Sequence, residues 1–80
     1  MSTSVNQQIV SSFNAVHDAQ TRRQRVARFA KLVSLLRSQE LVPADGDDLL
    51  AELIDDGVDD PNFDAGLARL QQIVQDHTGP

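Results

Sequence analysis

Residues 45–57, with the sequence DGDDLLAELIDDG, contain the clearest helix start and stop in the chain. Three aspartates open the stretch: Asp45, Asp47 and Asp48. They suit the start of a helix because they cap free backbone N–H groups and face the positive end of the helix dipole. Four apolar residues follow: Leu49, Leu50, Leu53 and Ile54. Gly57 is a typical residue for ending a helix, so the pattern predicts a short helix over residues 47–56.

A second start signal, Asp60-Pro61, follows directly. Asp is a preferred N-cap, and Pro suits the first helical position because its missing N–H costs nothing there. The apolar stripe behind this signal is Phe63, Leu67, Leu70, Ile73 and Val74. It predicts a helix over residues 62–77. Gly66 inside this helix costs about 1 kcal/mol relative to Ala, and we therefore expect another helix to approach it closely.

The N-terminal half carries two apolar series with helical spacing. The first is Val5, Ile9, Phe13 and Val16, and the second is Val26, Phe29, Leu32, Val33 and Leu36. They predict helices over residues 4–17 and 21–38. On one continuous helix turning about 100° per residue, the two series would face nearly opposite ways, so we expect a break at residues 17–20. Thr21 and Gln24 have the spacing of a capping box at the new start.

These elements define an all-α protein, a small four-helix array over residues 1–78, with a disordered tail at residues 79–80. No segment shows strand-like alternation. A chain of 80 residues buries only about 60–65% of the surface that its unfolded form exposes. Small domains without disulfides or metals often gain buried area from a partner, and we therefore expect completion by dimerisation or by another protein.

Composition narrows the classes of function. The chain has no Cys, which leaves no disulfide framework, thiolate nucleophile or cysteine metal site. The first ten residues lack the basic start and apolar run of a signal peptide, and no stretch approaches the ~18 apolar residues of a membrane span. We expect a cytoplasmic protein that does not enter a membrane.

Charge is divided unequally along the chain. Residues 1–39 contain six basic groups and one acid, whereas residues 40–80 contain one basic group and eleven acids. The formal net charge of −5 hides this division. The unequal division of charge predicts either pairing between the two halves or two surfaces of opposite sign.

The basic groups are concentrated at the start of the second helix, in the cluster Arg22, Arg23, Arg25 and Arg28. Clustered arginines can neutralise phosphates, so the cluster is a candidate contact for an anion or a nucleic acid. At about 100° per residue, however, the cations encircle the helix instead of forming one stripe. Arg22 and Arg25 point toward the buried side, where arginines are tolerated mainly when paired, and we expect acids of the second half to pair with them. An anionic protein partner is the other alternative.

Catalytic and metal-binding patterns are weak. Ser11 and Ser12 do not have the helical spacing that would place them beside His17. The acidic residues between 45 and 64 do not match the order of ligands in a calcium-binding EF-hand loop. A helix-turn-helix at residues 47–77 would present acids to a phosphate backbone. We therefore expect no enzyme, no metal and no cofactor.

The sequence thus predicts a non-enzymatic protein–protein interaction or regulatory module that uses an apolar helix face flanked by charge. The expected partner is a protein, or a second copy in a homodimer. The expected binding face is Val5, Ile9, Phe13 and Val16, because the first helix is the least charged and the least demanded by the remaining core. The alternatives are a nucleic-acid-binding regulator that uses Arg22–Arg28, and an acidic mimic over residues 40–64 that binds a basic surface.

Overall fold

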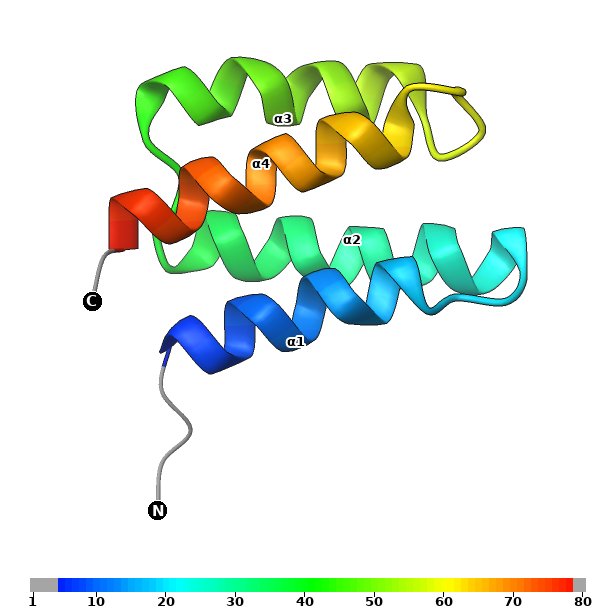
Figure 1. Ribbon diagram of the computed structural model, residues 1–80, viewed down its shortest axis with the longest axis horizontal. Coiled ribbons are helices and arrows are strands. Elements are labelled where there is room, and N and C mark those ends of the chain that lie inside the picture. The colour runs from blue at the N-terminus through cyan, green and yellow to red at the C-terminus, as the bar shows by residue number, and fades with distance from the viewer. Residues whose placement is uncertain (1–4, 79–80) are drawn as a thin grey trace.

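The computed structural model describes residues 5–78, and this part of the chain folds into α-helices joined by short turns. The helices are α1 (Val5–His17), α2 (Arg22–Ser38), α3 (Ala44–Asp56) and α4 (Phe63–Thr78). Each helix runs antiparallel to the one before it (Figure 1). The predicted all-α class and four-helix array are confirmed. Residue 4, the expected start of the first helix, and the expected tail at 79–80 lie outside the described residues.

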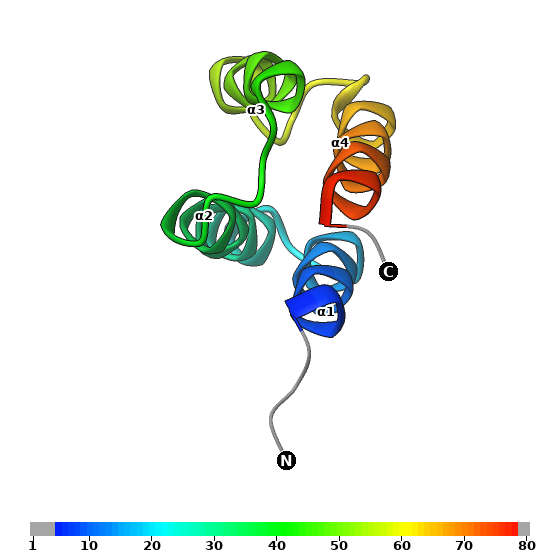
Figure 2. The ribbon, with the colours of Figure 1, turned by 90° about the vertical axis from the view of Figure 1, so that its left-hand side faces the viewer.

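Viewed along their axes, the helices follow one another around a rough square (Figure 2). α1 packs closely on α2 and on α4, and α4 packs closely on α3. The fourth side of the square, between α2 and α3, is the more open one. The shortest dimension of the molecule is 19 Å, which matches two layers of helices about 10 Å thick each.

The turn between α1 and α2 confirms the predicted break. The Thr21 side chain accepts a hydrogen bond from the backbone N–H of Gln24 at 3.1 Å. The Gln24 side chain in turn accepts from the N–H of Gln20 at 3.0 Å. A standard capping box would return this second bond to the N-cap residue itself, so here it is displaced by one residue.

The turn that follows α2 contains a left-handed residue that is not glycine. Glu40 has φ 53°, and the N–H of Leu41 donates to the carbonyl of Leu36 at 2.9 Å. This is the six-to-one bond of a Schellman motif, in which glycine is the preferred residue at the left-handed position. The side chain at that position therefore strains the backbone.

α3 begins at Ala44, three residues before its predicted start. The N-cap is Pro43, with φ −70° and ψ 167°, and its carbonyl accepts from the N–H groups of Gly46 and Asp47. The aspartates were therefore wrongly expected to cap this helix. They lie within its first turns, where their charge still opposes the positive end of the dipole.

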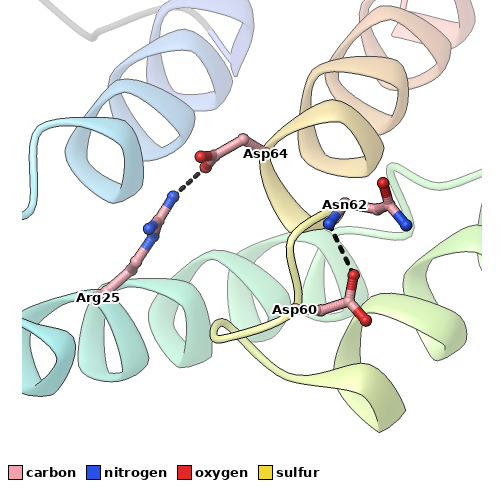
Figure 3. A network of polar contacts seen from close by, with 4 residues as sticks. All are labelled: Arg25, Asp60, Asn62 and Asp64. Carbon is pink, nitrogen blue, oxygen red and sulfur yellow. Dashed lines mark hydrogen bonds and ion pairs between the residues drawn. The ribbon is translucent and has the colours of Figure 1, made fainter.

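The end of α3 and the start of α4 follow the sequence signals closely. Gly57 has φ 84° and its N–H donates to the carbonyl of Leu53 at 3.0 Å, which confirms the predicted stop. The carboxylate of Asp60 accepts from the N–H of Asn62 at 2.7 Å (Figure 3). This is the predicted N-cap contact. The first turn is tightened, because Phe63 N–H donates to the Asp60 carbonyl, and regular α4 starts at Phe63.

All four helices contribute to one apolar core. Its buried members are Ile9, Phe13, Val16, Phe29, Leu32, Leu36, Leu41, Leu50, Leu53, Val58, Phe63, Leu67, Leu70 and Val74. The close approach predicted at Gly66 is confirmed. A Cβ built on this residue would lie 2.7 Å from a methyl group of Leu53 on α3.

The first helix has a different place from the one expected. Ile9, Phe13 and Val16 are each 0% exposed and pack inside the monomer, where α1 contacts both α2 and α4. The core therefore needs α1 as much as any other helix. Low charge on a helix does not show that its apolar face is free, because a core helix needs few charges as well.

Candidate functional site

The open side of the helix square holds a hollow with a mostly apolar lining. This hollow has a volume of about 490 Å³ and lies between α2 and the end of α3. Its apolar lining is Val26, Phe29, Ala30, Val33, Ile54 and Val58. Its charged lining is Arg22, Arg37, Asp56 and Asp59. Ligand and partner sites are typically concave and apolar with a few polar groups at the edge, and this hollow has that form.

The two walls each carry an exposed large apolar side chain. Val26 on α2 and Ile54 on α3 are both 43% exposed, and they are the exposed large hydrophobic residues among those that the structure describes. Both line the same hollow. Scattered exposed apolar residues need no explanation, whereas a pair on facing walls of one groove indicates a contact surface.

A second hollow continues the groove toward the other end of α2. It has a volume of about 670 Å³ and shares Arg37 with the first. Leu36, Val42 and Ala51 supply its apolar lining, and Asp47, Asp48 and Glu40 supply acids. We call the two hollows together the α2–α3 groove. It runs along both helices, so an elongated ligand such as a helix or a strand fits it better than a small molecule does.

One end of the α2–α3 groove is held by contacts between the basic and the acidic halves of the chain. Arg22 pairs with Asp59 in the α3–α4 turn at 2.6 Å. Arg25 pairs with Asp64 in the first turn of α4, as Figure 3 shows. The pairing of these two arginines with acids of the second half, expected from the sequence, is present in the structure.

Arg25 also covers an aromatic pair beneath it. Its guanidinium carbon lies 5.3 Å from the centroid of the Phe63 ring. Phe63 meets Phe29 edge to face, with ring centroids 5.1 Å apart and an angle of 83° between the planes. Edge-to-face rings and a cation over a ring face are both favourable arrangements. These contacts join α2 to the start of α4, and Phe29 also lines the first hollow.

The remaining arginines of the cluster differ from each other. Arg28 donates to the carbonyl of Ala15 at 2.9 Å and so satisfies a free acceptor at the end of α1. Arg23 is exposed, and its side chain has no ion-pair or hydrogen-bond partner within residues 5–78. Three of the four guanidinium groups therefore have internal acceptors, and the structure does not gather the cluster into one free basic surface.

Three of the four residues of the expected binding face are buried in the core. Ile9, Phe13 and Val16 are inaccessible in the folded monomer, and the side chain of Val5 lies outside the described part of the chain. The α2–α3 groove was not predicted as a site. Its signal in the sequence was the width of the apolar arcs: Leu49, Leu50, Leu53 and Ile54 span about 140° of α3, more than one core contact needs.

Other chemistry has little geometric basis in the described residues. Within residues 5–78, no group of three or more His, Asp or Glu side chains is arranged to hold a metal ion. None of the helices in this part is long and apolar enough to cross a bilayer. A third hollow, of about 630 Å³ between α3 and α4, is rimmed by Glu52, Asp56, Asp60 and Arg69.

Comparison with known proteins gives no relative from which to transfer a function. The chain matches no protein-family model, no curated protein and no solved structure. The function is therefore inferred from the geometry of this chain alone.

Proposed function

We propose that this protein is a non-enzymatic interaction module of the cytoplasm that binds a protein partner along the α2–α3 groove. The observation that carries the proposal is the placement of Val26 and Ile54, 43% exposed each, on facing walls of one apolar groove. A protein interface places its apolar residues at the centre and its charges at the rim. The first hollow of the groove has this arrangement, with Arg22, Arg37 and Asp59 at its edges.

The polar groups of the groove support contact more than catalysis. The first hollow is lined by Arg and Asp side chains, with no Ser, His or Lys among its lining residues in the described part of the chain. This lining therefore lacks the serine or lysine nucleophile and the histidine base that many covalent mechanisms use. A rim of fixed charges instead selects and orients a partner of complementary charge.

The two alternatives from the sequence have less support. In nucleic-acid binding, phosphates would compete with the internal acceptors of Arg22, Arg25 and Arg28. An acidic mimic would use the exposed acids of α3 and the acid-rimmed hollow between α3 and α4. Neither alternative explains why two large apolar side chains remain exposed on one groove.

The proposal is tested by a photo-activated cross-linking residue placed at Val26 in cells that make the protein naturally. We expect a defined cross-linked protein product at this position. The matched control is the same residue at Ala68, which is exposed on α4 and lines none of the three hollows. Equal products at both positions, or none at Val26, would contradict a groove-specific interaction.

A further inference from the structure

The walls of the α2–α3 groove carry residues at the spacing of a helix–helix seam. On α2 the groove residues with this spacing are Arg22, Val26, Ala30, Val33 and Arg37, separated by four, four, three and four residues. On α3 they are Asp47, Ala51 and Ile54, separated by four and three. Phe29, Leu36, Asp48 and Asp56 also line the groove. This spacing keeps one stripe facing a neighbouring helix. The stripe on α2 lies beside the buried stripe of Phe29, Leu32 and Leu36, so α2 has one face for the core and another for a partner.

The charged residues that the two helices contribute to the groove have opposite signs. Arg22 and Arg37 line it from α2, whereas Asp47, Asp48 and Asp56 line it from α3. Small alanines lie between the charged ends, Ala30 on one wall and Ala51 on the other. A partner helix can therefore pack closely at the centre of the groove, and the charged ends of the groove favour a partner of complementary charge.

We infer that the occupant of the groove is a second copy of this chain, related by a two-fold axis along the groove, so that α2 of each protomer lies on α3 of the other. This inference rests on the proposed function and names its partner. A surface with one basic and one acidic wall is complementary to itself under such a rotation. Each copy brings its basic wall to the acidic wall of the other.

The direction of the axis follows from charge. A two-fold axis across the groove would instead place α2 on α2 and α3 on α3. Arg37 of one copy would then lie near Arg22 of the other, because the two helices would be antiparallel, and acids would face acids. Like charges placed together at an interface oppose association. The axis along the groove avoids both contacts.

The same axis also keeps each hollow at its own end of the groove. Val26 and Ile54 line the first hollow, so the rotation brings the exposed apolar residues of the two copies together around the axis. Arg37 and Asp47 line the second hollow on facing walls, and the rotation brings these two together between copies. The dimer thus buries the exposed apolar pair at one end and joins opposite charges at the other.

The first experiment is sedimentation of the purified chain over a range of concentrations. We expect the mass to rise from 8.8 kDa to twice that value as concentration increases. Val26→Asp should weaken association at least tenfold, while Ala27→Asp, an exposed position on α2 outside the groove, should leave it within twofold. Helicity by circular dichroism confirms that both variants fold.

The second experiment tests the pairing of the walls between copies. Arg37→Glu and Asp47→Arg should each weaken the homodimer, because each gives the two walls the same sign at the second hollow. An equal mixture of the two variants should restore association as a heterodimer. Restored association in the mixture can come only from pairing between copies, because neither variant carries both changes.

Three outcomes would overturn the inference. These are a wild-type chain that is monomeric at every concentration, tighter association of Arg37→Glu alone, and a mixture that stays monomeric. Tighter association of Arg37→Glu would indicate the axis that places α2 on α2. A wild-type monomer that still cross-links to a different protein through Val26 would contradict the homodimer and agree with the proposed function. A wild-type monomer that gives no cross-link through Val26 would contradict both the homodimer and the proposed function.

Discussion

Arg25 on α2 is joined to Asp64 on α4, and this pair links the basic half of the chain to the acidic half across the core. The side chain of Arg25 is 28% exposed and that of Asp64 is 63% exposed. The guanidinium rests over Phe63, with its Nε buried and without a hydrogen-bond partner in the described residues. The pair therefore combines charge, packing and a cation–ring contact, with some loss from the buried Nε.

Replacing Arg25 should cost more stability than replacing its neighbour Arg22. We expect Arg25→Ala to lower the free energy of unfolding by about 1–2 kcal/mol, because it removes a partly buried pair and the cover of Phe63. Arg22 is 70% exposed in its pair with Asp59, and Arg22→Ala should cost less than about 0.5 kcal/mol. Urea denaturation of both variants measures the difference. Equal losses would mean that the ring contact contributes nothing.

Arg28 should stabilise the end of α1 through one hydrogen bond. Arg28→Met keeps most of the aliphatic stem and removes the donor to the Ala15 carbonyl, so we expect a loss of about 1 kcal/mol. The matched control is Arg23→Met, since Arg23 is exposed and without a partner in the described residues, and its effect should stay within about 0.5 kcal/mol. Thermal unfolding of the two variants compares them. A larger loss at Arg23 would contradict the described hydrogen-bonding pattern.

Local chemistry explains why most helix boundaries were predictable. Thr21, Gly57 and Asp60 each act through atoms within a few residues of themselves, and the observed capping bonds are of that kind. The predicted start of α3 was wrong because two local signals compete there. Pro43 fixes an extended backbone ahead of the helix and its carbonyl accepts the first bonds, which leaves the following aspartates inside the helix.

The candidate site was less predictable because it depends on which flank of an apolar arc meets the core. Val26 and Ile54 belong to apolar series with buried members, and spacing alone assigns them to the same face. Their exposure follows from the wider separation of α2 and α3, which is a property of the packed helices. Pairing of Arg22 and Arg25 with acids was predictable from charge, whereas the identity of Asp59 and Asp64 required the fold.

Glu40 is a position where glycine should improve the fold. Its φ of 53° is unfavourable for a residue with a Cβ, and its acidic charge lies near the negative end of the α2 dipole. We expect Glu40→Gly to raise the free energy of unfolding by about 1 kcal/mol, or the midpoint of thermal unfolding by about 4–8 °C.

The control for this change is the preceding residue. Gln39 has φ −105°, so Gln39→Gly relieves no strain and should be destabilising through the entropy of the unfolded chain. Calorimetry of the two variants gives the comparison. A loss of stability in Glu40→Gly would show that the residue does not hold the left-handed conformation in solution.

Phe13 and Val26 should respond in opposite ways to the same substitution. Phe13 is 0% exposed at the centre of the core, and even Phe13→Ala should cost about 3–5 kcal/mol. A domain of this size has about 4–12 kcal/mol of stability in total, so Phe13→Asp, which also buries a charge, should unfold the chain. Val26→Asp should keep its helicity and lose association, because Val26 lies on the groove wall. Circular dichroism and sedimentation of the two variants separate the effects. A folded Phe13→Asp that had only lost association would return the binding face to α1.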